Sequence, residues 1–101
     1  MMQKKEHITI TIADILLEYL EDADLSQNAL ARALGIPSTR IHEIMRNRRR
    51  ITADTDLRLC KFFSKSDGFF LRIQDNLTLR KVKLEIEKDL VAIIPYSKQV
   101  A

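Results

Sequence analysis

The chain has 101 residues, of which 46% are hydrophobic, and its formal net charge is +3. This length suits a single domain with its own core, and two glycines and two prolines are too few for a turn-rich β protein. No apolar run approaches the ~20 residues that span a membrane, and a single cysteine, Cys60, excludes an intramolecular disulfide. We therefore expect a helical, cytoplasmic protein.

The first ten residues, 1–10, are predicted to form a flexible arm, although the alternating stretch HITITI would also allow a short strand. A helix is predicted next, because apolar residues recur at helical spacing and Thr11 can cap the amino end. The helix is expected to end near Asp22–Asp24, where two aspartates favour a turn. Its buried face would consist of Ile12, Leu16, Tyr19 and Leu20.

Two short helices are predicted next, and Ser26 and Ser38 are their candidate N-caps. Gly35 lies between them and suits the left-handed residue that ends a helix. The first would bury Ala29, Leu30, Ala33 and Leu34, and the second would bury Ile41, Ile44 and Met45. Because small alanines let another helix approach closely, we expect these two helices to pack against each other.

A fourth helix is expected to begin after Thr52, its N-cap. Asp54 and Asp56 lie in its first turns, where a carboxylate suits the positive end of the helix dipole. This is a simpler explanation for the two carboxylates than a catalytic pair. The helix would bury a wide face made of Leu57, Leu59, Cys60, Phe62 and Phe63.

A fifth helix, capped by Ser66 or Asp67, is predicted to run to about Leu79. Its buried side would consist of Phe69, Phe70, Ile73 and Leu77. The apolar pattern continues through Val82, Ile86, Leu90 and Ile93, either in the same helix or in a sixth helix after a kink, and Pro95 ends it. The predicted fold is all-α, with five or six helices over residues 11–94 and a flexible tail over residues 95–101.

Positive charge is concentrated in residues 36–50, which hold five arginines and one glutamate. A solvated turn would account for such a run by itself. The two short helices joined at Gly35 instead have the pattern of a helix-turn-helix, whose second helix enters the major groove of DNA. We therefore interpret the arginines as phosphate contacts, which give affinity without sequence preference.

The predicted DNA-contacting residues have different roles. The side chains at the start of the second short helix would face base edges, and Gln27, at the amino end of the first, would bind a phosphate. Base edges would be contacted by Ser38, Thr39, His42 and Glu43, and the flanking segment would contribute Arg40, Arg46, Asn47, Arg48, Arg49 and Arg50.

The segment LSQNALARALGIPSTRIHEIMRNRRRITADTDLRLCKFF, residues 25–63, resembles antitoxins of the HigA/VapI type in the XRE group, and FFLRIQ, residues 69–74, resembles the family's FWLNLQ. The resemblance implies a lambda-repressor-like domain that dimerises through its C-terminal helices. The dimer would bind an inverted-repeat operator in double-stranded DNA, repress its own operon and neutralise a HigB/RelE-like RNase toxin. The dimer contacts implied are Phe69, Phe70, Ile73 and Leu77.

One position departs from the family's pattern, because Arg48 stands where the family usually has glycine. A positive φ at Arg48 would store strain of about 1 kcal/mol or more. Otherwise Asn47 adopts the turn conformation.

Three other functions remain as alternatives. An enzyme is disfavoured, because His7 and His42 are the only histidines and no nucleophile has a base beside it. We also expect no metal, no other cofactor, no small-molecule substrate and no membrane partner. A stand-alone XRE regulator or phage-type repressor would bind DNA without a toxin. A protein-interaction module would use the apolar stretch LVAIIPY, residues 90–96.

Overall fold

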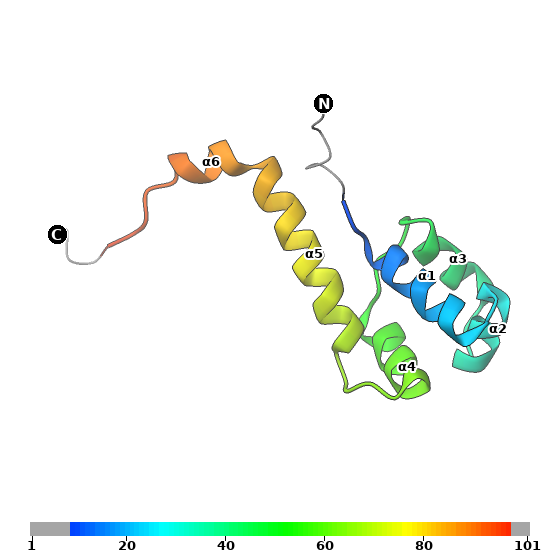
Figure 1. Ribbon diagram of the computed structural model, residues 1–101. Coiled ribbons are helices and arrows are strands. Elements are labelled where there is room, and N and C mark those ends of the chain that lie inside the picture. Colours follow the sequence, from blue (N-terminus) through cyan, green and yellow to red (C-terminus); the bar gives the residue numbers. More distant parts are fainter. Residues whose placement is uncertain (1–8, 98–101) are drawn as a thin grey trace, which may run out of the picture.

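The computed structural model describes residues 9–97, and within this range it has six helices and no strand. Figure 1 shows their arrangement. The helices are α1 (Ile12–Ala23), α2 (Gln27–Leu34), α3 (Ser38–Met45), α4 (Ala53–Phe63), α5 (Phe69–Glu85) and α6 (Glu87–Ala92). The all-α prediction is thus confirmed. Thr9 and Ile10 belong to no strand, whereas residues 1–8 and 98–101, including His7, lie outside the described part.

Side-chain caps begin three helices where the sequence predicts them. Thr11 and Asp14 form a capping box on α1, in which the Thr11 amide donates to Asp14 Oδ2 at 2.9 Å. Ser26 Oγ accepts from the Ala29 amide at 3.0 Å, and Thr52 accepts from the Thr55 amide. These caps are local in sequence, and each satisfies a backbone donor that has no partner inside its helix.

Two other predicted caps are wrong. Ser38 is already inside α3, which begins after Pro37 and has no side-chain cap. Proline suits a helix start because its fixed φ is compatible with that position. The N-cap of α5 is Gly68, at φ 86°, rather than Ser66 or Asp67.

The amino end of α5 is instead capped by a side chain from α4. Asp56 is only 1% exposed, and its two carboxylate oxygens accept from the Gly68 amide at 2.7 Å and the Leu71 amide at 2.8 Å. Cys60 Sγ lies 3.5 Å from the same carboxylate. The sequence predicts that Asp56 stabilises the dipole of its own helix, but both of its hydrogen bonds to backbone amides reach the start of the next helix, so it joins α4 to α5.

The core lies between α1, α2, α3, α4 and the first half of α5. Its buried apolar members are Ile12, Leu16, Leu20, Leu30, Ala31, Leu34, Ile36, Ile41, Ile44, Ile51, Leu59, Cys60 and Phe70. The predicted faces of α1 and α3 are therefore correct. Tyr19 lies at the edge of this core, where its ring packs against Phe70 with centroids 5.2 Å apart.

The predicted faces of α2 and α4 need correction. Ala31 is buried and Ala33 is exposed, so Ala31 is the small residue that lets neighbouring helices approach α2. On α4, Leu57 is 48% exposed and Phe62 is 40% exposed, whereas the buried side includes Thr55 and Asp56. Polar residues are buried on this side of α4 because it faces α5, where Asp56 accepts hydrogen bonds from amide groups at the start of that helix.

The chain consists of a helical body, residues 11–78, and a C-terminal arm, residues 79–97. The helix α5 continues past the predicted end near Leu79 to Glu85, and α6 follows after a break at Ile86. Every described residue of the arm is exposed. The radius of gyration is 17.9 Å, against about 13 Å for a compact chain of this length, because the arm extends away from the body (Figure 1). None of the described helices is long and apolar enough to cross a membrane.

Candidate nucleic-acid interface

The turn between α2 and α3 sets the geometry of the candidate interface. Gly35 ends α2 at φ 72°, a conformation that costs little only without a Cβ. Its amide and that of Ile36 bond back to carbonyls of the last turn, and Ile36 is buried. Pro37 then starts α3 at once. The two short helices therefore pack against each other across a tight turn, as a helix-turn-helix requires.

One side of α3 is fixed in the core and the other side is polar. Ile41 and Ile44 are both 1% exposed, so the helix cannot rotate about its axis without exposing them. Thr39 is fully on the outer side, while Ser38, His42 and Glu43 are half-buried at its edges. The structure thus brings the four predicted base-contacting residues to one accessible surface of one helix.

Two of these polar residues already have partners within the chain. His42 Nε2 lies 3.0 Å from Asn28 Oδ1, which connects α3 to the first turn of α2. Glu43 accepts a hydrogen bond from Arg49 Nε at 2.8 Å. Thr39 has no side-chain partner among residues 9–97. The Ser38 side chain also has none in this range, but it is half-buried, so Thr39 is the exposed residue of this group that can meet a base edge without first losing an internal contact.

The segment that follows α3, residues 46–50, is called here the basic loop, and all its residues are exposed. Asn47 adopts the left-handed conformation, at φ 59°. Arg48 has no positive φ, and its amide donates to the Glu43 carbonyl at 2.8 Å. Asn47 therefore makes the turn, and the arginine in the family's glycine position is not strained. Asparagine tolerates this conformation better than most residues.

The five arginines of residues 36–50 fall into two groups. Three of them are paired with carboxylates: Arg40 with Asp54 at 3.1 Å, Arg49 with Glu43 at 2.8 Å, and Arg50 with Asp75 at 2.9 Å. The side chains of Arg46 and Arg48 have no hydrogen bond or ion pair to any described residue. These two are consequently free to neutralise phosphates, a difference that the sequence alone does not reveal because the pairing depends on how the chain folds.

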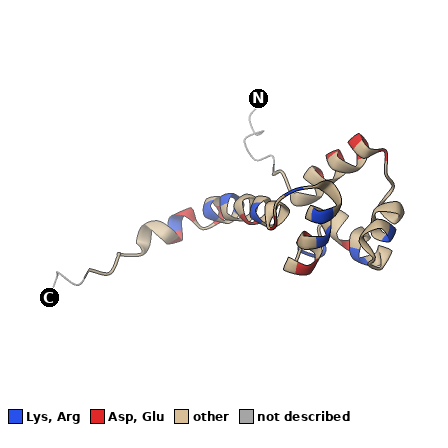
Figure 2. Ribbon diagram, turned by 90° about the horizontal axis from the view of Figure 1, so that it is seen from below, with Lys and Arg blue, Asp and Glu red and all other residues tan. Residues whose placement is uncertain are grey.

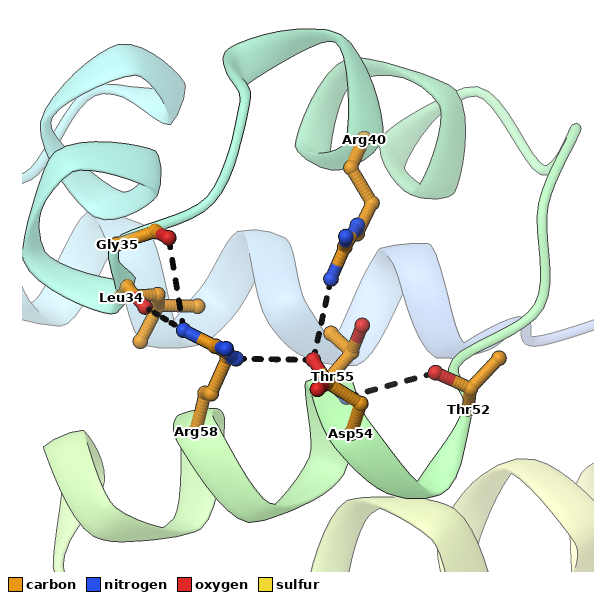
Figure 3. A network of polar contacts seen from close by, with 7 residues as sticks. All are labelled: Leu34, Gly35, Arg40, Thr52, Asp54, Thr55 and Arg58. Carbon is orange, nitrogen blue, oxygen red and sulfur yellow. Dashed lines mark hydrogen bonds and ion pairs between the residues drawn. The ribbon is translucent and has the colours of Figure 1, made fainter.

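A network around Asp54 holds α3, and the turn between α2 and α3, against α4 (Figure 3). Asp54 Oδ1 accepts from Arg58 Nε at 2.8 Å and from Arg40 Nη1. Arg58 also donates to the Leu34 carbonyl at 2.8 Å, which satisfies a carbonyl at the end of α2. The hydrogen bond from Arg58 is the main cause that lowers the pKa of Asp54, and the charges of Arg58 and Arg40 add to it. Arg58 is a positioning residue that the sequence analysis missed.

Gln27 is the first residue of α2, directly after the Ser26 cap, and it is half-buried. It thus lies where the sequence predicts a phosphate contact, at the positive end of a helix dipole.

The four dimer contacts predicted from the sequence differ in how much of each side chain is exposed. Phe70 is 0% exposed within its own chain and cannot touch a second one, whereas Phe69, Ile73 and Leu77 are half-buried. Among the described residues, no cluster of histidine, cysteine or acidic side chains could hold a metal ion.

Comparison with known proteins agrees with this geometry. A family model described as HTH_3, Helix-turn-helix, matches residues 16–70. The chain is 39% identical over 95 residues to Virulence-associated protein I of Dichelobacter nodosus, covering 93% of this chain and 87% of that protein.

Two solved structures share the fold over nearly the whole chain. An addiction module antidote protein of a HigA family from Coxiella burnetii is 38% identical, with a TM-score of 0.80, and the match covers 86% of this chain and 97% of that one. The antitoxin HigA of Pseudomonas aeruginosa, solved with the higBA promoter, is 32% identical, with a TM-score of 0.79 and coverage of 89% and 100%. The chain therefore belongs to the XRE-type helix-turn-helix family, within its HigA/VapI group.

Proposed function

We propose that this protein is the antitoxin of a type II toxin–antitoxin system. As a homodimer it binds an inverted-repeat operator and represses its own operon, and it neutralises a HigB/RelE-like RNase toxin. The observation that carries the DNA-binding part is the fixed exposure of one polar side of α3, followed by a fully exposed basic loop. Two related structures support the rest: an addiction module antidote protein of a HigA family, and the antitoxin HigA with the higBA promoter.

The roles within the interface follow from which side chains are free. Thr39 contacts a base edge directly, and Glu43 contacts one after exchanging Arg49 for a cytosine amino group. Arg46 and Arg48 bind phosphates, as does Gln27 at the start of α2. Ser38 and His42 lie at the edges of the contact. Arg40 supports α3 through Asp54 rather than meeting DNA.

The dimer uses the arm instead of the buried Phe70. The arm exposes apolar side chains that no part of the described chain covers, and such patches mark interaction surfaces in soluble proteins. They are Leu79, Val82, Leu84, Ile86, Leu90, Val91, Ile93, Ile94 and Tyr96. Two copies joined there would place two α3 helices on successive major grooves, with half-sites about 34 Å apart.

The DNA-binding proposal is tested by comparing affinities for a duplex from the protein's own promoter and for a random duplex of equal length. The double variant Thr39→Ala/Glu43→Ala should lose about 1–3 kcal/mol of discrimination for each contact removed. Its thermal stability should stay close to that of the wild type, because neither side chain is in the core. Glu18→Ala, at an exposed position of α1, controls for the lost negative charge. Unchanged discrimination in the double variant would remove α3 from the interface.

The toxin-binding part is tested by co-expression with the product of the adjacent reading frame. A stable complex of the two chains, in which the RNase activity of the partner disappears, is the expected result. Operator binding without any such complex would favour a stand-alone regulator of the same family.

A further inference from the structure

The basic loop is joined to α5 by a buried polar side chain. Gln74 is 4% exposed, its Oε1 accepts from the Ile51 amide at 2.6 Å, and its Nε2 donates to the Ile51 carbonyl at 2.9 Å. One side chain therefore satisfies both backbone groups of the residue that directly follows the loop. The Ile51 side chain is itself buried in the core. The end of the loop is thus fixed on α5 by two hydrogen bonds in a site with little access to water.

A second contact beside it holds the last arginine of the loop. The Arg50 guanidinium donates to Asp75 Oδ1 at 2.9 Å and to Thr78 Oγ1 at 3.0 Å. These two acceptors stand next to Gln74 and one turn beyond it on α5. Arg50 is therefore directed towards α5 by two acceptors at once, whereas Arg46 and Arg48 of the same loop have no described partner. Figure 2 shows the helix to which the loop is attached, projecting from the other helices.

We propose that Gln74, Asp75 and Thr78 form a tether that positions the basic loop for DNA, and that Arg50 is a positioning residue instead of a phosphate contact. This inference rests on the proposed function. A loop of exposed arginines loses conformational freedom when it binds phosphates, which weakens binding. The tether removes part of that freedom during folding, so Arg46 and Arg48 are held in place before DNA arrives.

The tether also connects the two functional parts of the molecule. Gln74, Asp75 and Thr78 belong to α5, and the same helix continues into the exposed arm. In a dimer joined through the arm, the position of each basic loop is consequently set by the helix that makes the dimer contact. A loose loop would leave the spacing between the two sets of phosphate contacts undefined.

The tether and a simple charge effect predict opposite signs for the variant Asp75→Ala. If charge alone matters, removing a carboxylate near the basic loop strengthens DNA binding or leaves it unchanged. If Asp75 holds Arg50 in place, its removal weakens binding to the promoter duplex by roughly two- to fivefold, which is the range for an exposed ion pair. Asp75 is exposed, so the fold should persist.

The matched control is Asp67→Ala, which removes the same charge just before α5, where the exposed Asp67 side chain makes no hydrogen bond or ion pair with the basic loop. Weaker binding by Asp75→Ala together with unchanged or tighter binding by Asp67→Ala supports the tether. Equal or tighter binding by both variants overturns it.

Gln74→Met tests the buried half of the tether, because it keeps the length of the side chain and removes both hydrogen bonds to Ile51. We expect binding to the promoter duplex to weaken by about tenfold or more. In the free protein, amide hydrogen exchange at Ile51 should accelerate while Leu16 in α1 stays protected. Unchanged exchange at Ile51 overturns the tether. If Gln74→Met does not fold, binding of the promoter duplex by Asp75→Ala tests the tether instead.

These outcomes are distinct from a failure of the proposed function. If the wild-type protein does not prefer its promoter over a random duplex, the proposed function is wrong, and the DNA role of the tether is overturned with it. If the wild type shows that preference and Asp75→Ala binds as well, the proposed function stands and only the tether is overturned.

Discussion

The body and the arm use similar apolar residues in opposite ways. In the body, leucines and isoleucines from four helices and the first half of α5 close around one core. In the arm, residues of the same kind remain exposed, with Val91 at 82% and Ile94 at 87%. The body can therefore satisfy its hydrophobic surface within one chain, whereas the arm cannot. An apolar pattern therefore predicts helices well, but it does not say whether the apolar side of a helix is covered by its own chain or by another.

The largest effect is expected from removing the Asp56 link between α4 and α5, which lies inside the body. Asp56→Ala leaves the Gly68 and Leu71 amides without their acceptors at the start of α5. Because these are buried, charge-assisted hydrogen bonds, we expect a loss of about 3 kcal/mol in the free energy of unfolding. Urea unfolding at fixed protein concentration measures this change. Asp56→Asn keeps one acceptor oxygen, so its free energy of unfolding should fall less. Equal stability of the wild type and both variants would contradict the role given to Asp56.

The arm is tested by the double variant Ile86→Asp/Leu90→Asp, which places charges on its apolar surface. Self-association should weaken by about 2 kcal/mol, or roughly 30-fold in the dimer Kd, because buried apolar contacts are lost. Sedimentation velocity over a concentration series measures the Kd. Lys88→Asp, which lies between these two positions in the chain, is the control and should associate more like the wild type. Equal Kd values for the double variant and the wild type would place the dimer contact outside the arm.

The smallest expected effect concerns the Asp54 network, which supports α3 within the body. The pKa of Asp54 is lowered in the folded protein, mainly by the Arg58 hydrogen bond. A lowered pKa contributes stability above the unfolded value of 3.8, and that contribution disappears as the pH falls through the folded value. Asp54→Asn should therefore have a slightly lower Tm than the wild type at neutral pH, with the gap closing as the pH falls below the unfolded value of 3.8.

Thermal unfolding of both proteins across this pH range measures that gap. Asp22→Asn, at an exposed position that has no ion pair in the described chain, is the control. A gap that stays constant down to the most acidic pH would show that Asp54 acts through something other than its charge.

The sequence predicts those features whose causes are close together along the chain. Thr11, Ser26 and Thr52 cap the helix that follows each of them, and Gly35 ends the one before it. The polar side of α3 is predictable for the same reason, because Ile41 and Ile44 define its buried stripe by spacing alone. Local signals of this kind specify the helix-turn-helix and most of the candidate DNA-contacting surface.

The features that sequence analysis misses depend on remote partners. Asp56 has a local role available in its own helix, yet it caps a helix twelve residues further on. Arg50 and Arg46 look equivalent in the sequence, but only Arg50 meets Asp75 across the fold. The role of Gln74 has one weak indication in the sequence, because it is a polar residue within an otherwise apolar stripe of α5. Such a residue deserves to be considered as a buried hydrogen-bonding partner before it is assigned to the surface.

A hydroxyl-radical footprint of the protein on its own promoter tests directly whether α3 and the basic loop bind DNA at a specific site. We expect two protected half-sites with centres about 34 Å apart along the duplex, related by an inverted repeat. Protection should be strongest at the deoxyriboses beside the phosphates that Arg46 and Arg48 reach, and Arg46→Ala/Arg48→Ala should weaken both half-sites together. Uniform protection along the duplex, or none at concentrations that saturate a control repressor, would contradict the claim that α3 and the basic loop form a sequence-specific DNA interface.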